Sequence, residues 1–163
     1  MSKDNPEEFN LLNTTQYRFD IQKIPNVNYY LQTATLPTVT IDQPIFPIAH
    51  LQDMSVPGSQ MQLEPFDVTF LVDQDLTNYL EIYKWIANII FTEDHDKHVS
   101  DATLHFLTGN MNVNKSVKFY DVFPTVMTEL AFASDDSDID GITCNVTFSY
   151  KYFEIDGIKI GNL

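Results

Sequence analysis

Basic residues are scarce in this chain. Its 163 residues include 9 Lys and Arg against 23 Asp and Glu, so the formal net charge is 9 − 23 = −14. A protein that binds nucleic acid tightly neutralises phosphates with Lys and Arg, and an anionic membrane surface attracts the same residues. The composition therefore argues against tight binding to nucleic acid and against binding to an anionic membrane.

Cysteine and glycine are also rare, with one cysteine and five glycines. One cysteine cannot form an internal disulfide and suits a reducing cytoplasm. Cys144 lies on the apolar side of an alternating segment, which predicts a core thiol and not a nucleophile. The few glycines leave little material for a phosphate-binding loop, and the sequence has no G-x-S-x-G or G-x-G-x-x-G motif. We expect a protein that is not an enzyme and that has no cofactor.

Long apolar runs are missing. The longest, residues 86–91, is far shorter than the ~20 residues that cross a bilayer, and residues 1–14 contain acids and amides where a secretory leader would be apolar. We therefore expect no membrane anchor and no secretory signal. Hydrophobic residues make up 44% of the chain, enough to form one core. We expect a flexible segment over 1–14 and a single domain over 15–163.

Hydrophobic periodicity predicts a mainly β protein. Apolar residues alternate with polar ones, as in half-buried strands, over 16–24, 28–35, 39–41, 66–72, 102–108, 116–122, 125–133 and 143–155. Residues 76–90 have the spacing of an amphipathic helix, with Asp75 as N-cap, and Ile82, Trp85 and Ile89 widen its apolar stripe so that it meets a second partner. The predicted fold is an antiparallel β-sandwich or barrel with one flanking α-helix.

Residues 43–65 differ from their surroundings. Prolines at 44, 47, 57 and 65, together with Gly58, interrupt any long strand, and an unstructured loop of this length is uncommon unless it is functional or disordered. We expect an extended loop whose apolar residues contact another subunit: Ile45, Phe46, Ile48, Leu51, Met54, Val56, Met61 and Leu63. The alternative is that the loop folds back over its own core.

Two acidic clusters are candidate metal sites. Residues 93–98 contain two histidines and three carboxylates, but without the cysteine partners or the H-E-x-x-H frame that make such a site specific. Asp136, Asp138 and Asp140 match the first half of a calcium loop, whereas Thr147 stands where the closing carboxylate is needed. We expect solvated acidic segments and no metal, with calcium at residues 136–140 as the alternative.

Several short segments follow one another in a set order: Tyr17–Ile21, Thr33–Pro37, Phe66–Phe70 before the helix at 79–90, Phe123–Thr125, Glu129–Phe132 and Val146–Phe153. This ordered set, which covers roughly residues 15–155, resembles the tail tube proteins of contractile-tailed bacteriophages. This family shares its fold with the hexamer-forming tube proteins of type VI secretion.

The resemblance implies a structural protein of the virion tail, assembled in the host cytoplasm. Six copies would form a ring whose inner sheets join into one barrel, and stacked rings would form the tube through which DNA leaves the capsid without tight binding. Acidic side chains facing the lumen would repel the DNA. The partners would be further copies, the tail sheath, and baseplate or neck proteins, with residues 43–65 as a contact between subunits. The alternative is a related ring, namely the tube initiator at the baseplate or the terminator at the neck.

Overall fold

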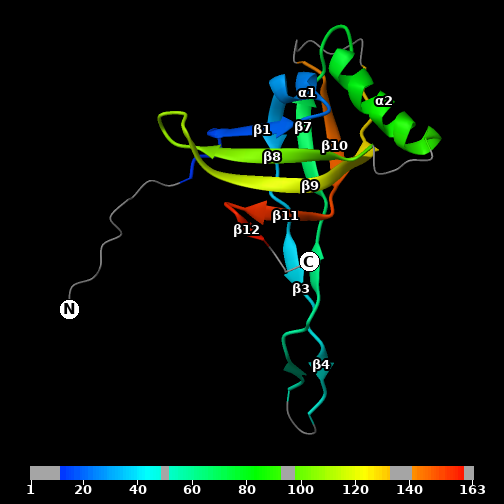
Figure 1. The fold of residues 1–163 in the computed structure, drawn as a ribbon. Helices are drawn as coiled ribbons and strands as arrows, with labels where there is room; N and C mark the ends of the chain where they lie inside the picture. The colour runs from blue at the N-terminus through cyan, green and yellow to red at the C-terminus, as the bar shows by residue number, and fades with distance from the viewer. Residues whose placement is uncertain (1–11, 49–51, 93–97, 133–140, 160–163) are drawn as a thin grey trace.

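Two antiparallel sheets cross each other in the body of the protein (Figure 1). The computed structural model describes residues 12–48, 52–92, 98–132 and 141–159. Sheet A contains β1 (Tyr17–Ile21), β8 (Ser100–Leu107), the first part of β9 (Val113–Met127), β11 (Tyr152–Ile155) and β12 (Ile158–Lys159). Sheet B contains the end of β9, β10 (Thr143–Ser149), β7 (Phe66–Leu71) and β2 (Leu31–Ala34). The predicted fold class is confirmed.

Strand β9 belongs to both sheets. Its first part pairs with β8 and β11, and its last part, Phe123 to Met127, pairs with β10. Asp121 has a φ of 54°, a left-handed conformation that bends the strand where it passes from one sheet to the other. The sequence predicted two strands here, because the bend interrupts the alternation. The strand predicted over 143–155 is divided in the same way, into β10 and β11.

The core between the sheets is built around Phe66. Its ring lies 5.7 Å from Phe19, 4.6 Å from Phe119 and 5.5 Å from Phe148, measured between ring centroids. These four rings come from β7, β1, β9 and β10, so each sheet contributes two of them. All four are buried. Aromatic pairs at such distances add to the free energy gained from burying their area.

Helix α2 (Thr77–Phe91) agrees with the helix predicted over 76–90. It buries Ile82 and Trp85, and the Trp85 ring lies 6.1 Å from Phe148. The prediction that Asp75 caps the helix is wrong. The N-cap position is Leu76, in a left-handed conformation and without a side-chain cap. Asp75 was expected to cap the helix because it directly precedes the helical spacing of apolar residues. The turn after β7 places a different side chain at the start of the helix.

That side chain is Asn78, which is fully buried. Its Oδ1 accepts a hydrogen bond from the Asp73 N–H at 3.2 Å, and its Nδ2 donates to the Leu71 carbonyl at 2.7 Å. Asn78 therefore ties the first turn of α2 to the end of β7.

A short helix that the sequence analysis missed precedes β2. Helix α1 (Pro25–Tyr29) occupies residues where a strand was predicted to begin, and Pro25 at its start has the φ angle that a first helical turn needs. The Asn28 side chain pairs with both the N–H and the carbonyl of Ile21, at 3.0 and 3.1 Å. These contacts hold α1 against β1.

We predict that Asn78→Ala lowers the free energy of unfolding by about 1–3 kcal/mol, because it leaves the half-buried Leu71 carbonyl and Asp73 N–H without these partners. Asp75→Ala, at an exposed residue, should change it by less than about 0.5 kcal/mol. Urea unfolding followed by circular dichroism measures both. Equal effects would show that the Asn78 bridge adds no stability.

Candidate assembly surfaces

A long β-arm projects from the body of the protein (Figure 1). In it, β3 (Val39–Ile41) pairs with β6 (Met61–Leu63), and β4 (Ile45–Phe46) pairs with β5 (Met54–Ser55). The segment predicted to be an extended loop is thus a paired ribbon, which we call the arm (residues 39–63). Its prolines lie outside the four strands, so they remove no hydrogen bond from either ladder.

Gly58 shapes the middle of the arm. Its N–H donates to the Asp42 carbonyl at 2.7 Å, and a Cβ at this position would lie 2.4 Å from the same oxygen. Only glycine allows the two backbones to approach this closely. Gly58, which the sequence predicts to interrupt a strand, therefore allows two backbone segments of the arm to approach each other.

The arm exposes most of the apolar residues predicted to make contacts. Ile45 is 66% exposed and Phe46 is 52% exposed, and Ile48, Met54 and Met61 are also exposed. Val56 is half-buried, Leu63 packs against the core, and Leu51 lies outside the described residues. The arm does not fold back over the body as the alternative supposed. An apolar surface of this kind is typical of a contact with another molecule.

Sheet B has two edges that carry no charged residue. Within the described part of the chain, no strand pairs with the outer side of β2 or with the outer side of β9 from Phe123 to Met127. Natural edge strands are usually protected by charges or by being short. Sheet A follows that rule, because β1 carries the ion pair between Arg18 and Asp20 at 2.8 Å and β12 has two residues. The edges of sheet B lack charges, although Pro124 lies on one of them and the Gln32 carbonyl on the other accepts a hydrogen bond from the Tyr17 hydroxyl.

The face of sheet B that points away from the core is polar and nearly neutral. On β7 and β10 its residues are Asp67, Thr69, Leu71, Thr143, Asn145, Thr147 and Ser149. They bond to one another: Thr147 Oγ1 donates to Asp67 Oδ1 at 2.6 Å, and Thr69 Oγ1 donates to Asn145 Oδ1 at 3.3 Å. Asp67 is the one carboxylate in this set.

Both candidate metal sites lie mostly outside the described residues. These undescribed residues are Glu93 to Lys97 in the first site and Asp136, Asp138 and Asp140 in the second. Among the residues that the structure does describe, no group of three or more His, Cys, Asp or Glu side chains could hold a metal ion. The described helices include none that is long and apolar enough to cross a membrane.

Cys144 is fully buried in β10. Burial raises the pKa of its thiol, while hydrogen bonds with Thr128 lower it to a smaller extent. A raised pKa leaves little of the reactive thiolate near neutral pH. This environment agrees with the predicted core role.

We predict that a thiol reagent such as iodoacetamide leaves Cys144 unlabelled in the native protein at pH 8 and labels it fully in guanidinium chloride. Below its raised pKa the thiol stays protonated, and burial blocks the reagent. Intact-mass spectrometry measures the labelled fraction. Rapid labelling of the native protein would contradict the assignment of Cys144 to the core.

The two sheets, the flanking helix and the arm make up a tail-tube-like fold. No family model matches the sequence. The chain is 24% identical over 173 residues to the tail tube terminator protein of Enterobacteria phage T4, covering 96% of this chain and 95% of the relative. The predicted resemblance to tail tube proteins is thereby confirmed, and with it a relation to a component of a phage tail.

Solved structures show the same fold. The tube-terminating cap of the anti-feeding prophage superposes with a TM-score of 0.70 at 16% identity, over 93% of this chain and 95% of the cap chain. Hcp1 from Flavobacterium johnsoniae gives a TM-score of 0.57 at 11% identity, over 90% of this chain and 99% of that chain. The predicted fold shared with a type six secretion system protein is confirmed.

Proposed function

We propose that this chain is a tube terminator, a ring-forming protein at the end of a phage tail tube, and not the main tube subunit. The observation that carries the proposal is the similarity to the T4 terminator along nearly the whole of both chains, and the fold of the terminating cap supports it. The sequence alone favours the main tube subunit, with the terminator among the alternatives. The comparisons favour the terminator.

The free edges of sheet B suggest how the ring closes. We expect β2 of one copy to pair with the last part of β9, Phe123 to Met127, of the next copy. Backbone hydrogen bonds across such a junction extend the sheet from chain to chain, and the contact is heterologous, so a suitable rotation closes it into a ring. Six copies would match the hexamer that the family resemblance implies.

The polar face of sheet B would then line the channel. It presents short neutral side chains and one carboxylate, Asp67, on β7 and β10. Such a lining offers no cation to hold phosphates, so DNA would pass without tight binding. On these two strands, the acidic lumen that the sequence predicts would then contain one carboxylate per subunit, Asp67. The net charge of −14 would repel neighbouring copies, and apolar burial must overcome that repulsion.

The partners follow from the proposed position. A terminator contacts the last ring of the tube, and we expect the sheath and neck proteins to meet its outer surface. Helix α2 offers one surface for such contacts, because Leu80, Tyr83 and Ile90 are exposed along it. Ile82 and Trp85, which the sequence predicted to widen the apolar stripe toward a second partner, are instead buried in the core, so a second partner for this helix stays a prediction.

We predict that the purified chain forms six-membered rings but not long tubes, and that adding it to growing tubes of the same phage stops their elongation. Sedimentation velocity measures ring formation, and negative-stain electron microscopy measures the number of copies per ring and the tube length. Long tubes grown from this chain alone would identify a main tube subunit. A strictly monomeric species under all conditions, including high salt and contact with tube ends, would contradict the proposal.

We predict that Val126→Lys weakens ring formation at least tenfold, which corresponds to about 1.4 kcal/mol, because a charge on an edge strand opposes pairing with another strand. Val126 is exposed on the free part of β9. Ile158→Lys is the matched control, since Ile158 is an exposed apolar residue on the edge of sheet A. Sedimentation velocity compares the two. An equal loss in both variants would argue against closure through sheet B.

A further inference from the structure

A cleft with basic side chains lies beside helix α2. Its volume is about 340 Å³. Lys23 and Ile24 line it from the chain between β1 and α1, and His98 lines it from the chain just before β8. One side of α2 provides the other lining residues, Glu81, Lys84, Trp85 and Asn88, whose spacing of three and four places them along one helix face. We call this cavity the basic cleft.

The charge of the basic cleft is unusual for a chain of net charge −14. Two of the nine Lys and Arg residues, Lys23 and Lys84, lie here with one carboxylate, Glu81. Lys23 Nζ lies 5.5 Å from the centroid of the Trp85 ring. Lys84 is exposed, and none of the ion pairs found among the described residues includes it. The cleft therefore attracts an acidic occupant.

Polar atoms at the cleft also lack partners. Glu81 Oε1 accepts a hydrogen bond from Asn26 Nδ2 at 2.5 Å, but Glu81 Oε2 and His98 Nε2 are buried without a hydrogen-bond partner in the described structure. Buried polar atoms normally have one. A peptide that enters the cleft can supply both after a small side-chain rotation, because a backbone N–H donates to a carboxylate and a carboxylate accepts from an imidazole N–H.

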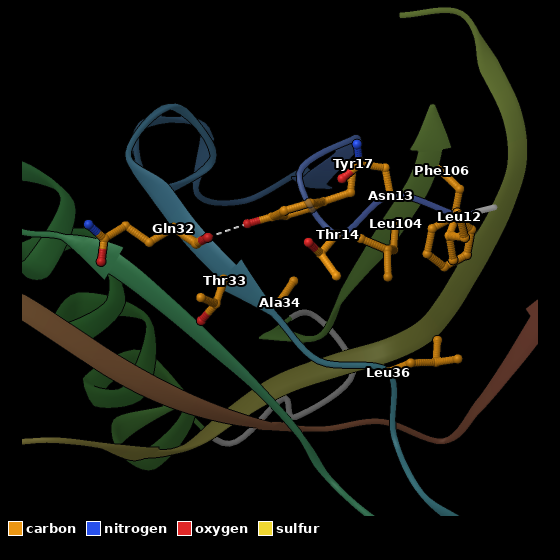
Figure 2. A pocket seen from close by; sticks show the side chains of 10 residues that line it. All are labelled: Leu12, Asn13, Thr14, Tyr17, Gln32, Thr33, Ala34, Leu36, Leu104 and Phe106. Atoms are coloured by element: carbon orange, nitrogen blue, oxygen red, sulfur yellow. Dashed lines mark hydrogen bonds between the residues drawn. The ribbon is translucent and has the colours of Figure 1, made fainter. Parts of the chain in front are cut away.

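The basic cleft lies on the side of the body that would face the next copy in the proposed ring. Sheet A ends at β1 on this side and sheet B ends at β2, and an apolar pocket of about 340 Å³ opens between the two strands, with Leu36 and Leu104 in its lining (Figure 2). Lys23 follows β1, and α1 leads into β2. The cleft is therefore at one end of this open side.

Strand directions bring one segment of the next copy toward the cleft. Sheet B has the order β9, β10, β7, β2, and each neighbouring pair is antiparallel, so β9 and β2 run in opposite directions. A rotation about the ring axis preserves direction, and β9 of the next copy would thus pair antiparallel with β2. Its end would lie beside the start of β2, which directly follows α1. The chain after β9 would continue toward the cleft.

The chain after β9 is strongly acidic. Residues 129–140 include five carboxylates and no Lys or Arg. Glu129 is exposed, and Phe132 is 75% exposed. The other four carboxylates lie outside the described residues and are Asp135, Asp136, Asp138 and Asp140. On a chain with so few basic residues, such a segment is repelled by most surfaces and attracted by the basic cleft.

We propose that the basic cleft of one copy binds the acidic segment 129–140 of the next copy, with Lys84 and Lys23 facing its carboxylates. The proposal rests on the proposed ring closure through β2 and β9, and it names a second contact at the same junction. Ion pairs beside a junction of paired strands fix the orientation of the partners more than they add affinity. The contact would also offset part of the repulsion between acidic copies.

Cross-linking with a carbodiimide tests the pairing in the unmodified chain. The reagent joins a lysine amine to a carboxylate in direct contact as an amide and takes up the water that is lost. Rings are assembled from equal amounts of isotope-labelled and unlabelled chain, and digests are analysed by mass spectrometry. We expect links from Lys84 to residues 129–140 that combine both isotopes, as only links between copies do. Lys118, an exposed lysine on β9, should give no such link.

Charge reversal provides a second test. Lys84→Glu should weaken ring formation about fivefold at low salt and less at high salt, because it replaces attraction by screened repulsion. Lys118→Glu is the matched control with the same change in net charge. Adding Asp136→Lys and Asp138→Lys to Lys84→Glu should restore ring formation, since the charges are then exchanged. Sedimentation velocity measures assembly, and the fluorescence of Trp85, the one tryptophan, verifies folding.

The outcomes separate this contact from the proposed function. If rings form and Lys84 is linked to no residue of 129–140, the cleft assignment is wrong and the ring-forming function stands. Links confined to single copies would show that the cleft binds the segment of its own chain, which also overturns the contact between copies. Equal weakening by Lys84→Glu and Lys118→Glu would show that net charge, and not the cleft, limits assembly. If the unmodified chain forms no ring, both proposals fail.

Discussion

The packing of three phenylalanine rings, Phe19, Phe119 and Phe148, around Phe66 holds this protein together. The rings come from both sheets, and because the sheets cross, one cluster is enough to fix them face to face. The bend at Asp121 lets a single strand, β9, serve both sheets. Helix α2 closes the remaining side through Trp85, which reaches the same cluster. The arm and the free edges extend from this core and contribute little to it.

What the core leaves uncovered explains how the chain can assemble. Sheet B ends in two uncharged edges, the arm exposes an apolar tip, and a pocket opens between β1 and β2. A monomer gains nothing from these features, and unprotected edges invite aggregation. They become favourable when copies meet in a fixed geometry. The strong negative charge limits which surfaces of two copies can come into contact. Acidic surfaces repel each other, so contacts are favoured at neutral, apolar or basic surfaces.

Much of the fold could be predicted from the sequence. The alternation of Phe66, Val68 and Phe70 predicted β7, because it records which side of the strand faces the core. The helical spacing of apolar residues predicted the extent of α2. The pairing of the arm strands could not be predicted, since the prolines that signalled a loop lie between the strands. Helix α1 and the bend at Asp121 were missed for a related reason: each depends on tertiary contacts that override the local pattern.

The sequence by itself determined the fold class, the apolar character of residues 43–65, the core position of Cys144 and the negative charge, which argues against tight DNA binding. These properties depend on residue type and spacing. Only the tertiary structure decided which strands are sheet edges, and which residues form the pocket. Leu12, Ala34 and Leu104 are far apart in the sequence and share no pattern, so their meeting depends on the crossing of the two sheets. The polar face of sheet B also needed the pairing of β7 with β10 before Asp67 and Thr147 could be placed together.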